Sequence, residues 1–303
     1  MSKFSLFFNF FILTLLINFK ASYLYLGKPE YKTISKSSAV LLPNQVKTED
    51  KERFFKPPAI AASSALAMRL SDEKIIFEKN SDAKLPLASL TKLMTAYAAE
   101  KSKGKQNNFE VLIPITKEAV NQEGDDGLIL NEVFRSSVLR DIMLLGSSND
   151  AARALAGQTD KFVESMNKEA KNLGLKNTQF FNPTGLDISK TESGALGTAE
   201  DLAKLVLAIL KNYPYIFNIT TREEAELLSE NGFSHKIKNT NKLVFEIPGL
   251  IGGKTGFSDL AGGNLIIIAD LSFNEPYLFI VLNSTYEGRF EDMKNLYQFV
   301  KEL

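Results

Sequence analysis

Three short polar strings stand far apart in this chain, and any fold that it adopts has to accommodate all of them. They are Ser89-Leu90-Thr91-Lys92, Ser147-Ser148-Asn149 and Lys254-Thr255-Gly256, in that order. The first offers a hydroxyl with an amine one helical turn later, the second a hydroxyl with an amide, and the third a cation beside glycine. If one crevice holds all three, the chain carries the groups needed for acyl transfer to a serine.

The first string is typical of a helix start. Ser89 follows Pro86-Leu87-Ala88 and precedes residues 90–100, which are strong helix formers with apolar positions at helical spacing. Because positions three apart share a helix face, the Lys92 amine is expected beside the Ser89 hydroxyl, where exposed N–H groups favour negative charge. An N-cap serine with a surface lysine would give the same pattern.

The spacing serine-x-x-lysine is common in this chain, so local context has to separate its copies. Ser71 and Ser81 lie in polar, turn-like runs, and Ser102 lies in the lysine-rich end of a helix, so all three are predicted at the solvated surface. Only Ser89 opens a strongly helical segment.

The second string falls between two expected helices. Residues 138–145 form an apolar helical run that stops at Gly146, and a new helical run starts at Asp150. Ser147 and Asn149 are therefore expected in a tight interhelical loop. Ordinary capping and turn roles would also place these residue types there.

The third string precedes a strongly β-like run, residues 263–270. Glycines on a strand allow another backbone or a ligand to approach closely. Gly-Lys-Thr also occurs in phosphate-binding loops, but Pro248 stands where such a loop needs its leading glycine, and a strand rather than a helix follows. A nucleotide site is therefore disfavoured.

Taken in order, the three strings resemble those of the low-molecular-mass penicillin-binding proteins that act as D-alanyl-D-alanine carboxypeptidases. The resemblance runs from about residue 57 to the C-terminus. Beyond the strings it covers an opening hairpin at residues 65–80, the loop 181–187 before a helix capped by Thr198, and the strand signature 254–262.

The resemblance implies an α+β fold of the β-lactamase and penicillin-binding-protein type, with an antiparallel sheet flanked by helices and a largely helical subdomain. The expected elements agree, because strands at both ends of the domain enclose a helical middle that reaches about Asn212. The last strands are predicted at 254–270 and 277–283, joined by a turn at 273–276, before a C-terminal helix.

The resemblance also implies catalytic roles. Ser89 would attack as the nucleophile, with Lys92 as its base if desolvation and nearby positive charge lower the lysine pKa. Ser147 would relay a proton to the leaving amine, and Asn149 would fix the substrate amide. The backbone N–H groups of Ser89 and Phe257 would hold the oxyanion.

Substrate binding is implied for the third string. Lys254 and Thr255 would bind the terminal carboxylate of the peptide, and Gly256 would let the peptide lie along the strand as an added β-strand. Arg289 is a further, weaker candidate for a carboxylate contact.

These roles imply a penicillin-sensitive, serine-type D-alanyl-D-alanine carboxypeptidase that removes the terminal D-alanine of peptidoglycan stem peptides through an acyl-enzyme. An endopeptidase that cuts D-alanyl cross-links uses the same chemistry and stays open, as does a wall-binding module without activity. A class A β-lactamase would need a glutamate to activate the deacylating water, and Glu164 and Glu169 are expected on the polar side of an amphipathic helix at 162–173.

Composition narrows the remaining classes. The chain has no cysteine and one histidine, which excludes disulfides, thiol catalysis and a multi-histidine metal centre, so no metal or cofactor is expected. His235 follows the Asn231-Gly232 turn and is predicted as an exposed loop residue, and there is no Gly-x-Ser-x-Gly elbow. Lys+Arg 36 balances Asp+Glu 36, so nucleic acid is not an expected partner.

The N-terminus predicts export. Residues 4–19 are almost all apolar and would reach roughly 24 Å as a helix, short of a bilayer core unless residues 21–26 are added. No convincing Ala-x-Ala cleavage site precedes Ala21, which favours an uncleaved anchor over a cleaved signal peptide. We therefore expect a signal or anchor at 1–26, a linker at 27–56 and an extracytoplasmic, membrane-anchored peptidase domain at 57–303, without the second domain common in the family.

Overall fold

The structure is a computed structural model that describes residues 57–103, 110–124 and 127–303. The segments predicted as anchor and linker, residues 1–26 and 27–56, lie outside the described residues. Within the described ranges, no helix combines the length and the apolar character needed to cross a bilayer.

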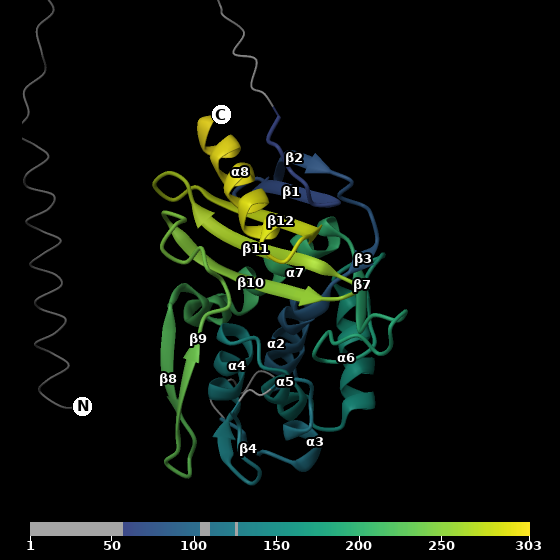
Figure 1. Ribbon diagram of the computed structural model, residues 1–303, viewed down its shortest axis with the longest axis vertical. Helices are drawn as coiled ribbons and strands as arrows, with labels where there is room; N and C mark the ends of the chain where they lie inside the picture. Colours follow the sequence, from purple (N-terminus) through teal and green to yellow (C-terminus); the bar gives the residue numbers. More distant parts are fainter. Residues whose placement is uncertain (1–56, 104–109, 125–126) are drawn as a thin grey trace, which may run out of the picture. The chain divides into compact units, whose positions relative to one another are not determined.

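A five-stranded antiparallel sheet joins the two ends of the described chain (Figure 1). Its spatial order is β10-β11-β12-β1-β2. The strands are β1 (Ser64–Arg69), β2 (Lys74–Lys79), β10 (Leu250–Ser258), β11 (Gly262–Asp270) and β12 (Pro276–Ser284). Ser64 at the start of β1 lies opposite Leu282 near the end of β12. The predicted α+β arrangement, with strands from both termini in one sheet, is confirmed.

Both faces of this sheet are covered, which explains why its central strands are apolar almost throughout. On β11, Leu265 and Ile267 face one core cluster, whereas Ile266 and Ile268 face the other, and all four are fully buried. A strand with both faces buried is expected to read as a continuous apolar run. This is the run that marked the strand in the sequence.

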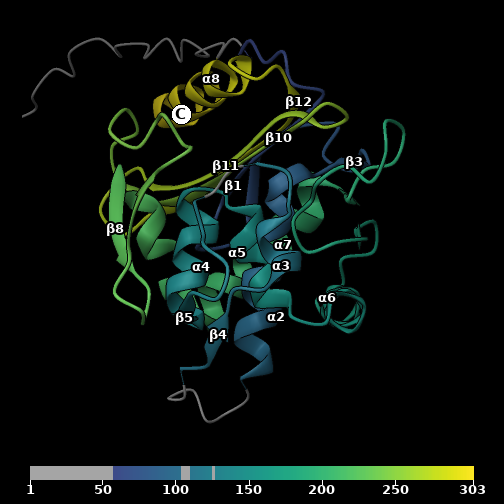
Figure 2. The same ribbon diagram turned by 60° about the horizontal axis from the view of Figure 1, so that its bottom comes forward.

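The helices divide between the two faces. They are α2 (Thr91–Ser102), α3 (Lys117–Val120), α4 (Ser136–Leu145), α5 (Asn149–Ala156), α6 (Thr159–Asn172), α7 (Ala199–Asn212) and α8 (Gly288–Glu302). The C-terminal α8 packs on one face of the sheet, and the helical region containing α2, α4, α5 and α7 lies on the other (Figure 2). The Thr198 hydroxyl accepts the backbone N–H of Asp201, so the predicted cap of α7 is present.

Short strands and turns connect these layers. They are β3 (Leu85–Pro86), β6 (Gln179–Phe180) and β7 (Ala195–Gly197) in one small sheet, β4 (Leu112–Pro114) with β5 (Val133–Arg135), β8 (Glu224–Leu228) with β9 (Ser234–Lys238), and the 3-10 segments η1 (Ala88–Leu90) and η2 (Pro214–Thr221).

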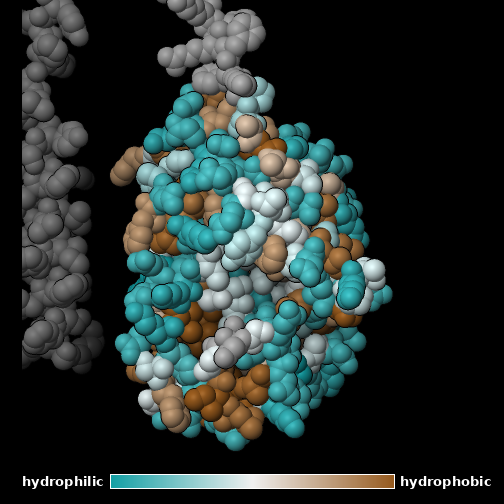
Figure 3. All heavy atoms as spheres, in the orientation of Figure 1, coloured by the Kyte–Doolittle hydropathy of each residue, from teal (hydrophilic) through white to brown (hydrophobic). Residues whose placement is uncertain are grey.

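In Figure 3 apolar residues gather at the lower end of the face shown, where Figure 1 places β4. Leu112 on that strand is 55% exposed.

The prediction for His235 is wrong. His235 lies on β9 rather than in a loop, is 8% exposed, and places Nε2 2.9 Å from Oε1 of Glu132. The β8–β9 hairpin packs beside β5, where the N–H of Val133 donates to Asn231 Oδ1 and the ring of Phe134 lies 5.5 Å from that of His235. Because this contact joins residues far apart in the chain, the local turn signal did not reveal it.

Two other side chains are more buried than their local sequence indicates. Glu169 was predicted on the polar side of its helix, yet it is 9% exposed, because α6 presents a wide face to α2. Burial and the charge of Glu169 both raise the pKa of Tyr97 on α2. Ser81, predicted at the surface, is 5% exposed and donates to Glu78 Oε2 or Glu200 Oε1.

The start of the described domain is held to α8 by one buried carboxylate. Asp292 accepts the backbone N–H groups of Ala61 at 2.7 Å and Ala62 at 2.9 Å, and the Ser284 hydroxyl at 2.6 Å. These three hydrogen bonds link the first described residues and β12 to α8. A buried donor that loses its acceptor costs about 1–3 kcal/mol, so the link contributes to stability.

We expect Asp292→Ala to lower the free energy of unfolding by about 2–3 kcal/mol, because its three donors lose their acceptor. Guanidinium or thermal denaturation of the two proteins measures the loss. Glu291→Ala is the control: its side chain is 69% exposed and, within the described ranges, forms an ion pair only with Lys294 at the surface, so a change below about 0.5 kcal/mol is expected. Equal losses in the two variants would contradict the assignment.

Candidate functional site

Ser89 lies at the middle of the short turn η1, directly ahead of α2. It was predicted at a helix N-terminus, and the structure places it one residue ahead of Leu90, the N-cap of α2. Ala88 before it has φ 45°, a left-handed conformation that costs a non-glycine residue about 1–3 kcal/mol. The turn therefore presents Ser89, which is partly exposed, from a strained backbone.

Lys92, the second residue of α2, joins three segments of the chain. Its Nζ lies 2.8 Å from Ser89 Oγ, 2.7 Å from Asn149 Oδ1 and 2.9 Å from the carbonyl oxygen of Thr184, and the side chain is fully buried. An amine taken out of water requires such acceptors. The predicted nucleophile and base are thus in hydrogen-bonding contact.

The Thr184 carbonyl comes from a loop that the sequence did not mark as part of the site. Asn182 Oδ1 accepts the N–H groups of Thr184 and Gly185, which fixes the turn. Gly185 has φ 80°, and a Cβ there would lie 1.9 Å from the Ala88 oxygen. Glycine is therefore required for this loop to pack against the turn that carries Ser89.

The second string is arranged differently from the prediction in one respect. Ser147 lies in the interhelical connection with φ 64°, but Asn149 is the first residue of α5, with Ser148 as its N-cap. Asn149 Nδ2 donates to the Glu123 carbonyl oxygen at 2.7 Å, which directs its Oδ1 towards Lys92. Asn149 therefore orients the lysine in this structure, in addition to the role expected of it towards a substrate.

The third string lies on β10, which has a neighbouring strand on one side only among the described strands. Lys254 Nζ donates to Ser147 Oγ at 2.7 Å and to the Thr255 carbonyl oxygen at 2.9 Å. Thr255 Oγ1 lies 2.5 Å from Thr240 Oγ1. The three strings thus meet at one place, through Lys92 with Asn149 and through Lys254 with Ser147.

The electrostatics of this place are dominated by buried cations. Burial lowers the pKa of Lys254 well below its ordinary value, and the charges of Lys92 and Arg289 lower it further. Among the described residues, no carboxylate forms an ion pair with Lys254 or Arg289. The site therefore favours an anionic ligand, and Lys254 loses its proton more readily than an ordinary lysine.

Arg289 on α8 reaches β10 from behind. Its Nη1 donates to the Gly256 carbonyl oxygen at 2.7 Å, and its guanidinium carbon lies 4.6 Å from the ring centre of Tyr286 and 4.8 Å from that of Phe290. The guanidinium is fixed by these contacts and is 3% exposed. It supplies positive charge beneath the strand.

β10 approaches the Ser89 turn closely because residue 256 has no side chain. A Cβ on Gly256 would lie 3.0 Å from the Leu87 oxygen and 3.3 Å from the Ser89 nitrogen. The Phe257 side chain points away, 45% exposed, with its ring 4.8 Å from that of Tyr286. Gly256 therefore packs against the Ser89 turn, and the backbone N–H of Phe257 belongs to the next residue along β10.

One positioning residue was missed entirely. Asn264 on β11 is fully buried, and its Nδ2 donates to the carbonyl oxygens of Pro86 and Leu87, both at 3.0 Å. Its Oδ1 accepts the N–H of Asn283 on β12. It fastens the segment before Ser89 to the sheet, and its only sequence signal is a polar residue at the start of an apolar strand.

A metal site is not evident in the described part of the chain, where no group of three or more His, Asp or Glu side chains is close enough to hold an ion. The arrangement offers a hydroxyl beside an amine, a second hydroxyl beside a second amine, and a strand, β10, that has a neighbouring strand on one side only among the described strands. These groups suit nucleophilic attack on a carbonyl within an extended peptide.

Comparison with known proteins gives concordant results. Residues 51–285 match the D-alanyl-D-alanine carboxypeptidase family. The D-alanyl-D-alanine endopeptidase of Escherichia coli is 32% identical over 234 residues, 75% of this chain and 73% of that protein. The carboxypeptidase DacA of Haemophilus influenzae is 32% identical over 268 residues, 84% of this chain but 65% of that protein.

A solved structure shares the fold. Penicillin-binding protein D2 of Listeria monocytogenes, determined with cefotaxime bound, superposes with a TM-score of 0.69 at 27% identity. The match covers 80% of this chain and 97% of that one. The fold predicted from the resemblance is thereby confirmed.

The buried Lys254 generates a prediction about pH. Its pKa is lowered in the folded state and is near the ordinary 10.5 in the unfolded chain, so between these values the unfolded state binds more protons and stability rises with pH. Lys254→Met lacks this dependence. Relative to the variant, the wild type should gain up to about 1.4 kcal/mol per pH unit inside that window.

Guanidinium unfolding of both proteins from pH 7 to pH 10 measures the difference. At pH 7 the variant should be at least as stable as the wild type, because the penalty of burying an amine among cations is removed. Lys168→Met, at an exposed position of α6, is the control and should parallel the wild type. Parallel curves for Lys254→Met would show that its amine is not perturbed.

Proposed function

The chain belongs to the D-alanyl-D-alanine carboxypeptidase family, and we propose that it is a serine-type D-alanyl-D-alanine carboxypeptidase that removes the terminal D-alanine of peptidoglycan stem peptides. One observation carries the proposal: Lys92 Nζ lies 2.8 Å from Ser89 Oγ in a place shared with Ser147 and Lys254. A hydroxyl of ordinary pKa needs an adjacent base to attack a carbonyl.

Acylation proceeds from this contact. Ser89 Oγ attacks the carbonyl carbon between the two D-alanines, and Lys92 Nζ takes the hydroxyl proton. The Thr184 carbonyl and Asn149 Oδ1 keep the amine directed at Ser89 in both protonation states. The backbone N–H groups of Ser89 and Phe257 hold the oxyanion of the tetrahedral intermediate.

The second pair serves the leaving group. Lys254 donates to Ser147 Oγ, which leaves the Ser147 proton free to pass to the departing nitrogen as the C–N bond breaks. D-Alanine then leaves as a free amine, Lys254 returns a proton to Ser147, and the acyl group stays on Ser89. The departing amine takes the proton that Lys92 received from Ser89, which makes Lys92 a base again. A water molecule then attacks the ester, Lys92 takes a proton from this water and passes it to Ser89 Oγ as the C–O bond breaks, and the shortened peptide is released.

Substrate binding uses charge and the side of β10 that has no neighbouring strand among those the structure describes. The terminal carboxylate faces the Thr255 hydroxyl and the positive field of Lys254 and Arg289, and the peptide backbone extends along β10 as an added strand. A β-lactam enters the same place. Attack by Ser89 opens its ring and the leaving nitrogen stays attached, so the acyl-enzyme persists and penicillin inhibits the enzyme.

Residues 57–303 form the peptidase domain on this proposal, and the protein works in the cell envelope, where peptidoglycan lies. The anchor at 1–26 and the linker at 27–56 stay predictions, because those residues lie outside the described part of the chain. Peptidoglycan and β-lactams are then the ligands of the site.

An endopeptidase activity on D-alanyl cross-links is the second candidate. The E. coli relative that matches 75% of this chain is an endopeptidase. The two reactions share every chemical step and differ in what lies beyond the scissile bond, a single D-alanine or a second peptide strand. The groups around Ser89 serve both equally.

Ser89→Ala should abolish covalent labelling by penicillin and lower D-alanine release by at least about a thousandfold, because the nucleophile is removed. Mass spectrometry of the intact protein after incubation with labelled penicillin detects the adduct. Ser102→Ala is a matched control, since Ser102 also precedes a lysine by three residues but, among the residues that the structure describes, donates only to the Ala99 carbonyl oxygen at the surface. Labelling that persists in Ser89→Ala would remove the assignment.

The two candidate activities are separated by substrate. The assignment as a carboxypeptidase requires kcat/KM for D-alanine release from a pentapeptide to exceed that for cleavage of a cross-linked dimer by at least about tenfold, about 1.4 kcal/mol in transition-state stabilisation. Chromatography of both reactions measures this. The opposite ratio would show that the protein is an endopeptidase. Rapid turnover of penicillin would show that it is a β-lactamase. If the protein forms no adduct and releases no D-alanine, it is a wall-binding module.

A further inference from the structure

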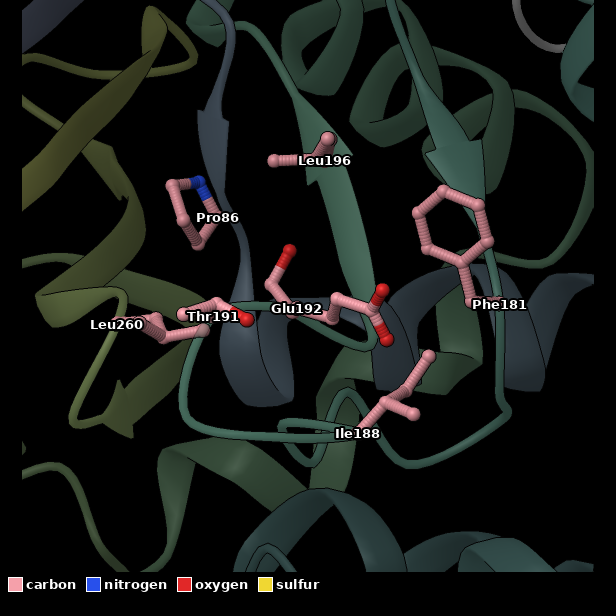
Figure 4. Close-up of a pocket in the computed structure, with 8 residues that line it drawn as sticks. Pro86, Phe181, Ile188, Thr191, Glu192, Leu196 and Leu260 are labelled. Carbon is pink, nitrogen blue, oxygen red and sulfur yellow. The ribbon is translucent and has the colours of Figure 1, made fainter.

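The hollow in Figure 4, of about 490 Å³, lies beside the Ser89 turn and belongs to the site already described. A different hollow, of about 500 Å³, opens where β10 begins and β11 ends, and it takes no part in that site. Five residues of β10, about 17 Å of strand, separate Ile251 in this hollow from Gly256. The lining residues used below are Leu207, Leu210, Lys211, Ile251, Ile268 and Asn274.

The walls of this hollow are mainly apolar. Ile268 is fully buried in the core, Leu207 and Leu210 on α7 are partly buried, and Ile251 is 37% exposed. An apolar cavity of about 150 Å³ is enough to bind benzene. The hollow is therefore large enough for an aromatic side chain, and its walls suit one.

An uncovered aromatic side chain stands next to the hollow. Phe273, on the turn between β11 and β12, is 102% exposed, so the described residues leave it uncovered. The turn itself is fixed, because Asp270 accepts the backbone N–H groups of Asn274 at 3.0 Å and Glu275 at 2.9 Å. Asn274, the next residue, lines the hollow. The surface thus presents an aromatic knob and an apolar hollow side by side.

The charges of the knob and of the hollow are opposite in sign. Lys211 lines the hollow and is exposed, and no carboxylate of the described residues forms an ion pair with it. Asp270 and Glu275 flank Phe273 in the sequence, and Glu275 shares Arg69 with Asp72. The turn that carries the aromatic knob is therefore acidic, and the hollow carries a cation.

We propose that this surface binds a second copy of the chain, with Phe273 of each copy inserted into the hollow of the other. A knob and a hollow that adjoin on one surface can be exchanged by two copies about a two-fold axis, which gives a closed dimer. Lys211 of each copy then faces Asp270 and Glu275 of the other. The Ser89 crevice stays open in this dimer, so the inference goes beyond the proposed function and does not depend on it.

Cross-linking tests the contact directly, because the chain has no cysteine of its own. Two full-length proteins with tags of different size, one carrying Phe273→Cys and the other Ile251→Cys, are mixed in detergent and oxidised. We expect a disulfide-linked pair that contains both tags, since a disulfide needs the two Cα atoms within about 7 Å. Phe233→Cys replaces Phe273→Cys in the control mixture. Phe233 is also exposed, at 51%, but lies on the β8–β9 hairpin, so little mixed product is expected.

The dissociation constant separates the aromatic and the charged contributions. Analytical ultracentrifugation of the full-length protein in density-matched detergent measures it. Phe273→Ala should raise the dissociation constant by about tenfold or more, as for an aromatic anchor at the centre of an interface, and Phe233→Ala should leave it unchanged. Lys211→Glu and Glu275→Lys should each weaken the dimer, and the double variant should recover most of the loss, because the opposite charges are exchanged.

Each outcome decides for or against the inference. Recovery in the double variant supports it, because a folding defect in either single variant would not be repaired by the other change. A wild type that stays monomeric at every accessible concentration would show that the inference is wrong. A dimer with equal dissociation constants for Phe273→Ala and Phe233→Ala would place the interface elsewhere. Equal cross-linking in the two mixtures would reduce the contact to random collision.

Discussion

The burial of the Lys92 amine is the constraint on which the rest of the site depends. An amine without water has to find its acceptors within the protein, and Lys92 finds them on the Ser89 turn, on the first residue of α5 and on the loop at Thr184. Leaving such a group unpaired would cost several kcal/mol. The segments that carry the three acceptors are therefore held to one point, and one of these acceptors is the Ser89 hydroxyl, the proposed nucleophile.

The scaffold meets this constraint by backbone contacts at short range. Gly185 lets its loop touch the Ala88 carbonyl, Gly256 lets β10 touch the Ser89 nitrogen, and Asn264 ties the same turn to β11. Each contact joins main chain to main chain or to a buried amide side chain. The position of the Ser89 turn therefore does not depend on long, flexible side chains. The sheet that carries β10 and β11 is itself buried on both faces, which makes it a rigid reference for the turn.

Much of this could be predicted from the sequence, because side-chain patterns carry it. The apolar run of β11, the hairpin of β1 and β2 and the Thr198 cap are local signals, and the three strings indicated which segments meet. The features that could not be predicted depend on main-chain groups or on contacts between residues far apart in the sequence. The carbonyls of Thr184 and Glu123 orient Lys92 and Asn149, yet any residue type has a carbonyl. His235 is buried against Glu132 and Phe134, which lie far away in the chain.

The burial of Lys254, which is unfavourable for the folded protein, has a use in the proposed reaction. Burial, and to a smaller extent the nearby Lys92 and Arg289, depress the pKa of Lys254 in the empty site. A substrate carboxylate that binds there favours the charged form and raises that pKa, so carboxylate binding and proton uptake by Lys254 strengthen each other. The proton is then present when the nitrogen of D-alanine has to leave, with Ser147 between the two groups. Departure of D-alanine takes the carboxylate away and lowers the pKa again, which returns the site to its starting state for hydrolysis of the acyl-enzyme.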